Sequence, residues 1–435
     1  MTVRRVLPVA SGKGGVGKST FATNFALALS RAAPTVLVDL DPGTSSIRNT
    51  IDAPVERDLY HFFRRGEPLS RCLTTLPSRL DPHGLFKGFA FVAAPRHAME
   101  EFINLDDAHR LRLIRAINEL PATYVVLDLR AGLDANVLDF MPHSNSGILV
   151  FTPNPPSATL AAADIVKALL FRKLRLVFAP HGPLGRGGAA GPQLATINAL
   201  LDRVEDAYDE SITNLDAFLL DLAHAFGDTP LLRTLAEIID SFTVYFVLNL
   251  FDGVKESFEG AIAPFLTCLQ RDISAHIKTH NLGWVVASPE VHRANCQRIP
   301  LVLQAGRETP GEGQRHRVAA QLDELEISLG LAPKLKTQAA TPPLRDFLLS
   351  VDPQRALAEQ LEILTAMHRS TAAMHARDNF AYIVRRALHL LSTAAPDQFG
   401  QRRLLTPHEL CETLLASQRS VTLAGDGGAG AAPLL

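Results

Sequence analysis

The sequence has few of the residues and long apolar runs that mark disulfide-linked, metal-binding or membrane-spanning proteins. Its four cysteines lie far apart and form no Cys-x-x-Cys pair, which argues against a disulfide framework and against a zinc or iron–sulfur site. No stretch approaches about 18 uninterrupted apolar residues, so we expect no spanning helix. The N-terminal apolar run is too short for a signal peptide. We therefore expect a cytoplasmic protein, and peripheral attachment to a membrane or a polar complex stays open.

The sequence also lacks a strong excess of charge of either sign. Its 43 Lys and Arg residues nearly balance its 45 Asp and Glu residues, for a net charge of −2. Non-specific binding to nucleic acid needs concentrated positive charge, so DNA is an unlikely partner on this ground. With 47% hydrophobic residues in 435, the chain can bury one large core or two to three smaller ones.

Apolar runs alternate with helix-like stretches over the first 180 residues. The runs are nearly continuous, as in strands covered on both faces, and this alternation predicts a mostly parallel sheet. We expect strands at residues 5–10, 35–39, 89–93, 124–127 and 147–151, and helices at 19–33, 106–119 and 157–171. The fold class that follows is α/β, a three-layer α/β/α arrangement around a twisted sheet.

A Gly/Pro-rich loop at residues 181–193 interrupts the alternation. Residues 194–242 then have helical patterning throughout. Strand patterns resume at 244–251 and 282–288, with a helix expected over 258–279 between them. We interpret residues 1–303 as one α/β domain that carries a helical insertion at about 180–242.

A candidate phosphate-binding loop lies at residues 11–20, SGKGGVGKST, directly after the first expected strand. A glycine-rich turn that opens a helix points successive backbone N–H groups at one place, where they hold phosphate oxygens. In the pattern Gly12-x4-Gly17-Lys18-Ser19, the lysine reaches the β- and γ-phosphates and the serine hydroxyl binds Mg²⁺. The strand before the pattern and the helix after it separate it from a chance match.

A second lysine, Lys13, is not needed by that mechanism. It could stabilise charge on a transferring phosphoryl group, or it could be a solvated side chain on a turn. The stretch KGGVGKST resembles the deviant Walker A motif of the ParA/MinD family of ATPases. The resemblance implies that Lys13 reaches across an ATP-sandwiched homodimer to the partner's nucleotide. It also implies nucleotide contacts from Gly12, Lys13, Gly14, Gly15, Val16, Gly17, Lys18, Ser19 and Thr20.

Carboxylates at strand ends supply the second part of the site. Asp39 ends the expected strand at 35–39, and Asp41 follows two residues later. On an extended chain, side chains two residues apart point the same way. A helix N-cap or a turn at Asp41-Pro42-Gly43 is the alternative. The pair resembles the family's switch I, which implies that Asp39 binds Mg²⁺ through water and that Asp41 places the hydrolytic water.

In the stretch VVLDLRAG, Asp128 ends the apolar run, and Gly132 follows four residues later. This resembles the family's Walker B/switch II pattern, which implies a water-mediated metal contact for Asp128 and a γ-phosphate contact for the Gly132 N–H. Arg130 is a departure, because relatives usually have Gly or Pro there. It leaves the rate of hydrolysis and the geometry of the switch open.

Two later stretches extend the resemblance. Residues 151–169 resemble the family's TPEP(S/T) segment, and residues 288–302 resemble a stretch of MinD and of the flagellar regulator FlhG. By resemblance, Asn249 contacts adenine, although it could also cap a strand end. The loop at Pro289 and Glu290 should lie near the base.

The remaining 130 residues match no family that we recognise. We expect a partly ordered linker at 304–345 with one helix at 315–329, a helical extension at 346–420 and a disordered tail at 421–435. Thr406 and Glu409 form a capping-box pattern before a helix at 407–417. The amphipathic helical pattern at 374–391 favours packing on its own domain over binding a partner. Residues 404–422 have few cations, which favours packing over membrane binding.

The resemblance as a whole implies a MinD/FlhG-type ATPase that binds ATP, ADP and Mg²⁺ and forms a homodimer on ATP binding. Slow, partner-stimulated hydrolysis would then time the positioning or assembly of a cellular machine through an unidentified protein effector. A ParA-type DNA or cargo partitioning ATPase and a nucleotide-gated scaffold with little hydrolysis stay open as alternatives.

Overall fold

A single eight-stranded sheet organises the chain. The computed structural model describes residues 4–42, 46–142, 144–179, 191–205, 213–306, 351–371, 376–393, 399–406 and 409. The strands are β1 (Arg5–Ala10), β2 (Thr35–Leu40), β3 (Thr74–Thr75), β4 (Phe89–Val92), β5 (Tyr124–Leu129), β6 (Asn145–Phe151), β7 (Thr243–Phe251) and β8 (Lys278–Val286). Their order is β3-β4-β2-β5-β1-β6-β7-β8, and only the β3–β4 pair is antiparallel among the described strands.

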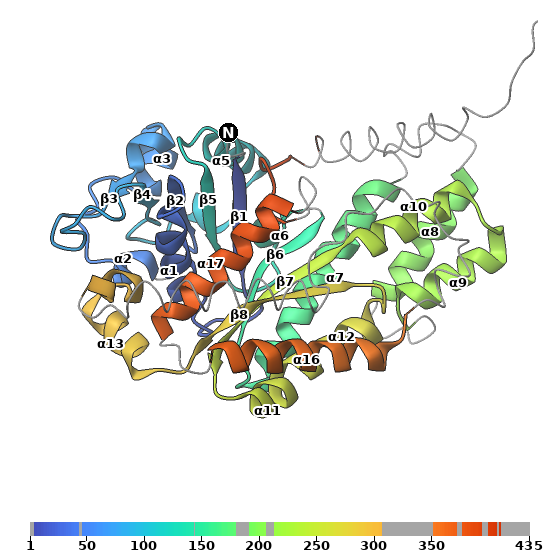
Figure 1. Cartoon of the computed structure of the whole chain (residues 1–435). Coiled ribbons are helices and arrows are strands. Elements are labelled where there is room, and N and C mark those ends of the chain that lie inside the picture. Colours follow the sequence, from blue (N-terminus) through green and yellow to red (C-terminus); the bar gives the residue numbers. More distant parts are fainter. Residues whose placement is uncertain are drawn as a thin grey trace, which may run out of the picture.

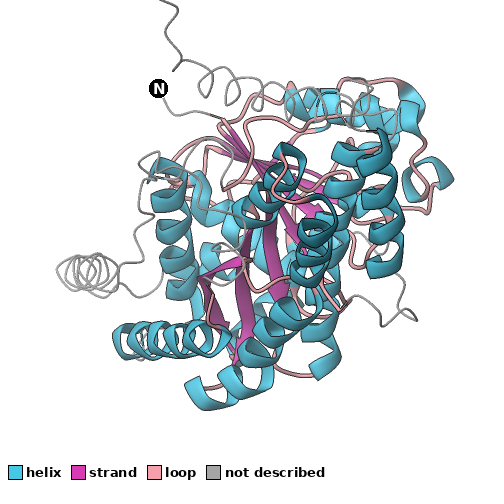
Figure 2. Ribbon diagram, turned by 90° about the vertical axis from the view of Figure 1, so that its right-hand side faces the viewer, coloured by secondary structure: helices cyan, strands magenta, loops and turns pink. Residues whose placement is uncertain are grey.

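Both faces of this sheet are buried. In β5, Val125 and Leu127 belong to one hydrophobic cluster and Val126 to the other, as the two-residue repeat of a strand requires. On the first face lie α5 (Asp107–Asn118), α7 (Pro156–Phe178) and α12 (Ala263–Asp272). On the second lie α1 (Lys18–Ser30) and α17 (Ala376–Thr393). Figure 2 shows helices on both sides of the sheet. The predicted α/β class with three layers is confirmed.

Short helices lie in the connections that follow several strands. They are α2 (Ser46–Thr50), α3 (Leu59–Arg65), α4 (Glu100–Ile103), α6 (Ala135–Leu138), α11 (Val254–Ser257) and α13 (Pro289–Gln297), together with the 3-10 turns η1 (Leu69–Cys72) and η4 (Leu301–Gly306). A π-helical turn, η3 (Phe258–Ile262), joins α11 to α12. No helix in the described ranges is long and apolar enough to cross a membrane.

Three helices stand between α7 and β7, where the sequence predicts a helical insertion. They are α8 (Gly191–Glu205), α9 (Leu215–Phe226) and α10 (Pro230–Ser241). They contact one another in chain order, and α8 and α10 also contact α7. In Figure 1 they form a group at the right of the sheet. Residues 181–190 of the expected Gly/Pro-rich loop lie outside the described residues.

The C-terminal helices pack on the same sheet. The second face carries α17 against β8 and α1, with the rings of Phe21 and Phe380 6.1 Å apart. Leu364 and Met367 of α16 (Pro353–Thr371) are buried beside α11 and α12. Gln401 pairs with Val6 of β1 through two backbone hydrogen bonds of 2.7 and 3.1 Å. Residues 376–393 and 399–405 therefore contribute to the core of the sheet domain.

Some boundaries differ from the sequence-based expectation. The helix expected to run to residue 279 ends at Asp272, and β8 begins at Lys278 instead of Leu282. The first residues of β8 are polar because this strand is an edge of the sheet and pairs only with β7. The expected helix at 315–329, most of that at 407–417 and the tail lie outside the described residues. Thr406 and Glu409 make both hydrogen bonds of the predicted capping box.

Candidate functional site

The glycine-rich loop lies between the carboxyl end of β1 and the start of α1. Gly15 and Gly17 have φ values of +83° and +82°, which only glycine adopts without strain. Gly17 is the N-cap of α1 and provides no side-chain hydrogen bond there. A Cβ at Gly12 would overlap the Ala161 carbonyl of α7, whereas Gly14 and Gly15 face open space. The loop therefore rests on α7 and leaves its outer side open to a ligand.

Lys18 begins α1 and is 5% exposed. Its Nζ lies 2.6 Å from Asp128 Oδ1 and 3.8 Å from Asp41 Oδ2. The strands β2 and β5 are neighbours with Asp39 directly opposite Asp128, so their carboxylates meet at one edge of the sheet. The sequence-predicted lysine and all three aspartates are thus brought together at this edge.

Burial, and after it the negative charge of the neighbouring Asp128, raise the pKa of the Asp39 carboxyl to about 7. Backbone N–H groups of Asp41 and Ile47 donate to the two Asp39 oxygens at 3.2 and 3.4 Å. Three carboxylates around the single ammonium of Lys18 leave an excess of negative charge in a buried place. This charge distribution favours an additional cation.

One buried oxygen faces this place without a partner. Asp128 Oδ2 accepts no hydrogen bond from the part of the chain that the structure describes, although Oδ1 is bonded to Lys18. An orphaned carboxylate oxygen in a buried site costs free energy unless a ligand or water satisfies it. The donor set therefore fits Mg²⁺, which binds through one or two carboxylates and keeps several waters.

Lys13 is exposed at the mouth of the loop. Its Nζ donates to Ser157 Oγ of α7 at 2.7 Å. Because both groups are exposed to solvent, this hydrogen bond stabilises the position of Lys13 only weakly. The side chain is free to exchange Ser157 for another acceptor.

Asn249 supports the loop from β7. Its Nδ2 donates to the carbonyl of Val16 at 2.8 Å, and a Cβ at Gly17 would overlap the same nitrogen. A bulge follows, in which Leu250 has a φ of 56°. Bulges re-aim side chains near functional sites, and here the bulge accompanies the turn of Asn249 toward the loop. The predicted adenine contact stays a prediction.

The second switch segment touches the loop through its backbone. The Gly132 N–H donates to Ser11 O at 3.0 Å, with a φ of +110° at Gly132. To bind a phosphate, this N–H must exchange that hydrogen bond. Arg130 is partly exposed and pairs with Asp134 at 3.1 Å. The departure from the family pattern is thus accommodated by an ion pair within the segment.

Two residues near the loop were not singled out from sequence. Ser157 holds Lys13, and Asn295 of α13 donates to the Thr20 hydroxyl at 3.3 Å. Both lie inside stretches that resemble the family, but no residue pattern identifies them individually. Pro289 is the first residue of α13, with Ser288 as N-cap, so the loop expected at Pro289 and Glu290 is a helix start. Ser19 is half-buried in the first turn of α1.

Residues 7–294 match the family described as the CobQ/CobB/MinD/ParA nucleotide binding domain. A proposed septum site-determining protein MinD of Nephroselmis olivacea is 28% identical over 178 residues, 40% of this chain and 62% of that protein. Antiactivator FleN of Pseudomonas aeruginosa is 27% identical over 164 residues, 37% of this chain and 55% of that protein. The chain therefore spans less than two-thirds of the length of either relative.

Among solved structures, MinD of Pyrococcus horikoshii OT3 complexed with Mg-ADP is similar, with 14% identity and a TM-score of 0.39. That comparison covers 70% of this chain and 90% of the other. The family match spans well over half of the 435 residues and includes the loop, both switch segments and Asn249. The chain belongs to the CobQ/CobB/MinD/ParA family of nucleotide-binding domains, as a P-loop protein of the ParA/MinD type.

Proposed function

We propose that this protein is a Mg²⁺-dependent ATPase that works as a MinD/FlhG-type switch. In this proposal ATP closes a homodimer, and slow hydrolysis opens it again. The observation that carries the proposal is the buried cluster around Lys18, in which one ammonium is shared by Asp128 and Asp41 beside an open glycine-rich loop. A phosphate group that enters the loop brings negative charge. Lys18 can then exchange its contacts with the carboxylates for a contact with the phosphate.

Nucleotide binding follows from the loop. Its backbone N–H groups and the N-terminal end of α1 attract phosphate oxygens, because the helix dipole places partial positive charge there. Lys18 reaches the β- and γ-phosphates from inside the loop. Asn249 keeps the loop in shape through Val16 and can offer its amide oxygen to the adenine. Thr20 and Pro289 stand on the side where α13 meets α1.

Mg²⁺ would be held by the Ser19 hydroxyl and, through water, by Asp39 and Asp128. When bound, the metal neutralises charge on the β- and γ-phosphates. The orphaned Asp128 Oδ2 is the acceptor available for a metal-bound water. Asp39, whose pKa is raised by burial and by Asp128, regains an ordinary ionised state when positive charge arrives beside it.

Hydrolysis requires an oriented water, and Asp41 is the residue proposed to place it. Its side chain is 25% exposed at the end of β2, so it borders both the buried cluster and the surface. Positioning of this kind, with electrostatic stabilisation by lysines, accounts for most of the catalysis in P-loop enzymes. We expect slow turnover in the absence of a stimulating partner.

The proposed dimer face surrounds the loop. Three of the large apolar side chains exposed within the described residues, Leu133, Leu160 and Leu250, are 45–49% exposed. Each follows or precedes a residue that contacts the loop: Gly132 bonds Ser11, Ala161 packs on Gly12, and Asn249 bonds Val16. Exposed apolar groups around a polar site are typical of protein interfaces. Lys13, at the centre of this face, would exchange Ser157 for the partner's nucleotide.

The relatives named MinD and FleN support a regulatory role, in which the ATP dimer positions or assembles a cellular machine. Their identity of under 30% does not distinguish this role from ParA-type partitioning. The near-neutral net charge favours a protein effector over DNA.

Hydrolysis rate and molecular mass with ATP and Mg²⁺ test the proposal in wild type, Asp41→Ala and Lys18→Ala. We expect slow hydrolysis by wild type, an ATP-bound dimer without hydrolysis for Asp41→Ala, and neither binding nor dimer for Lys18→Ala. Partner capture should then succeed with Asp41→Ala and fail with Lys18→Ala. The switch is refuted if both variants recover the same partners.

A further inference from the structure

A second buried lysine lies at the opposite edge of the sheet. Lys173, on the C-terminal half of α7, is 5% exposed. Its ammonium makes no hydrogen bond or ion pair with any residue in the described ranges. Burial lowers the pKa of this amine to about 8, so it still carries charge at neutral pH. Its Nζ is not among the side-chain atoms that are cut off from solvent, so an anionic ligand can reach this unpaired ammonium from the surface.

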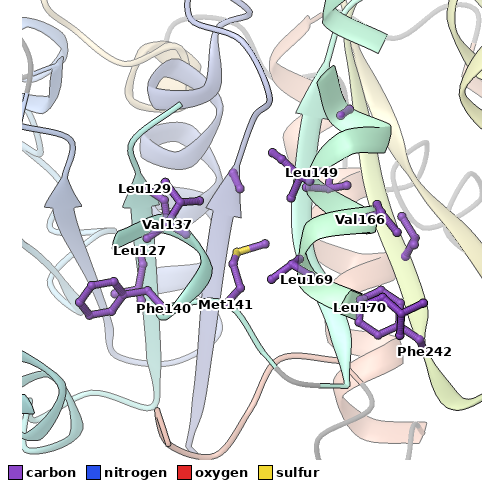
Figure 3. Packing of buried hydrophobic residues seen from close by; sticks show 14 of the residues in the cluster. Leu127, Leu129, Val137, Phe140, Met141, Leu149, Val166, Leu169, Leu170 and Phe242 are labelled. Atoms are coloured by element: carbon purple, nitrogen blue, oxygen red, sulfur yellow. The ribbon is translucent and has the colours of Figure 1, made fainter. Parts of the chain in front are cut away.

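Lys173 lines a cavity of about 50 Å³ between α7, the segment after α6 and the C-terminal segment. Its walls are mixed, with apolar side chains such as Met141, Leu169 and Leu405 beside the polar side chains of Asp139, Arg172 and Gln401. Figure 3 shows Met141 and Leu169 on their facing elements. A water-sized group needs roughly 10–15 Å³, so the cavity holds a ligand of about three to five non-hydrogen atoms. Leu405 and Leu176 are only half-buried, which leaves a path from solvent.

The charges beside the cavity define the kind of ligand. Asp139 is bonded by both Arg110 and Arg172, so its single negative charge faces three cations when Lys173 is counted. Asp107, the other acidic partner of Arg110, is 93% exposed and contributes little. The local charge is therefore positive. One unpaired ammonium beside apolar side chains matches a monoanion that carries a short hydrocarbon body, since a phosphate dianion would lose too much hydration there.

We propose that this cavity is a binding site for a small free carboxylate, with the carboxylate on Lys173 and a short alkyl chain against Met141 and Leu169. The site lies about 24 Å from the loop, the length of α7 from Ser157 to Lys173 at 1.5 Å per residue. It is thus separate from the proposed nucleotide site.

Each of the three elements that line the cavity is connected to the glycine-rich loop. The N-terminal end of α7 holds Lys13 and packs on Gly12. Gln401 is paired with Val6 of β1, the strand that ends in the loop. The segment after α6 continues from Gly132, which bonds Ser11. The second part of the proposal, which rests on the proposed nucleotide binding, is that the carboxylate changes nucleotide affinity through these elements.

Thermal unfolding of the full chain without nucleotide tests the site, with sodium propionate as probe and sodium chloride and sodium phosphate at equal ionic strength as controls. We expect a saturable rise of the melting temperature with propionate alone. Lys173→Met should weaken propionate binding by about 10-fold or more, the effect of one charge-assisted hydrogen bond. Lys167→Met, a half-buried lysine of the same helix, should leave it unchanged.

Leu176→Phe provides an independent check, because it fills the cavity and keeps Lys173. It too should weaken propionate binding. The site is refuted if wild type responds to propionate no more than to chloride, or if Lys173→Met and wild type respond equally. A response to a glutamate-containing peptide but not to propionate would also refute it, because it would point to a protein partner.

Equilibrium binding of ADP with and without propionate tests the coupling. We expect a several-fold change of the ADP dissociation constant in wild type and none in Lys173→Met. An unchanged dissociation constant in wild type refutes the coupling. The nucleotide-free melting experiment decides the carboxylate site independently, so failure of the proposed nucleotide function is distinguishable from failure of this site.

Discussion

Lys18 and Lys173 are equally buried, at 5% exposure each, but their surroundings differ. At the carboxyl edge of the sheet, Lys18 is shared by Asp128 and Asp41. At the amino edge, Lys173 has no counter-charge in the described part of the chain, and Asp139, the carboxylate that lines the same cavity, is already held by two arginines. The first ammonium is paired by the protein itself, whereas the second meets an anion only when a ligand brings one.

The same substitution should therefore have opposite effects at the two positions. Lys18→Met leaves Asp39 and Asp128 buried without their cation, and breaking a buried pair costs about 3–5 kcal/mol. We expect a loss of that order in the free energy of unfolding, measured by urea denaturation at pH 7. Adding Asp128→Asn to Lys18→Met should recover part of the loss. A loss below about 1 kcal/mol would contradict the role of Lys18 as the counter-ion.

The burial of Lys173 should be measurable in the pH dependence of the free energy of unfolding. Its pKa is lowered from 10.5 to about 8 by burial, so between these values the unfolded chain binds the proton that the folded chain has lost. Stability therefore rises as the pH increases through this window, by about 3 kcal/mol for this one group.

The measurement is the difference in unfolding free energy between wild type and Lys173→Met from pH 7 to 10.5, which removes the contributions of other groups. We expect Lys173→Met to be the more stable protein at pH 7 and the two to converge at high pH. A constant difference across the window would show that Lys173 is not a desolvated charge.

Asn249 offers a smaller test at the carboxyl edge. Asn249→Ala removes the hydrogen bond to the Val16 carbonyl and should cost about 1 kcal/mol of stability, together with weaker nucleotide binding. Thermal unfolding and ADP binding measure the two effects. Asn281→Ala is a matched control in the neighbouring strand, because Asn281 is also buried (4% exposed, against 9% for Asn249) but bonds only within β8. Equal effects of the two substitutions on ADP binding would argue against a special role for Asn249.

Much of the carboxyl edge could be predicted from the sequence because its signals are local. Strands β1, β2 and β5 are covered on both faces and read as continuous apolar runs, so their positions followed within two residues. The loop, Asp39 and Asp128 then followed from their place at strand ends. The resemblance to the ParA/MinD family is confirmed, whereas the roles of these residues stay predictions.

The burial and pairing of residues at the amino edge depend on contacts between segments that are distant in the sequence. No local sequence pattern encodes such contacts. Lys173 looks like an ordinary helix residue, and only the packing of α7 against the segment after α6 and against Gln401 and Leu405 buries it. The shared Asp139 joins arginines 29 and 33 residues away. In the same way, the sequence shows that residues 376–393 are amphipathic but not that their apolar face covers β8 and α1.

A third lysine completes the comparison with the smallest effect on stability. Lys13 is exposed and bonds only the exposed hydroxyl of Ser157, so Lys13→Ala should change the free energy of unfolding by less than about 0.5 kcal/mol. Urea denaturation checks this, with the exposed Lys255→Ala as control. A larger loss would mean that Lys13 stabilises the loop within one chain.

The most direct measurement of the proposed switch is the molecular mass of Asp41→Ala with ATP and Mg²⁺, with and without Lys13→Ala. Light scattering should give a dimer for Asp41→Ala and for its combination with Lys255→Ala. Asp41→Ala combined with Lys13→Ala should stay a monomer while it still binds ATP. An undiminished ATP-dependent dimer in that double variant would contradict a site completed by Lys13 of a second copy.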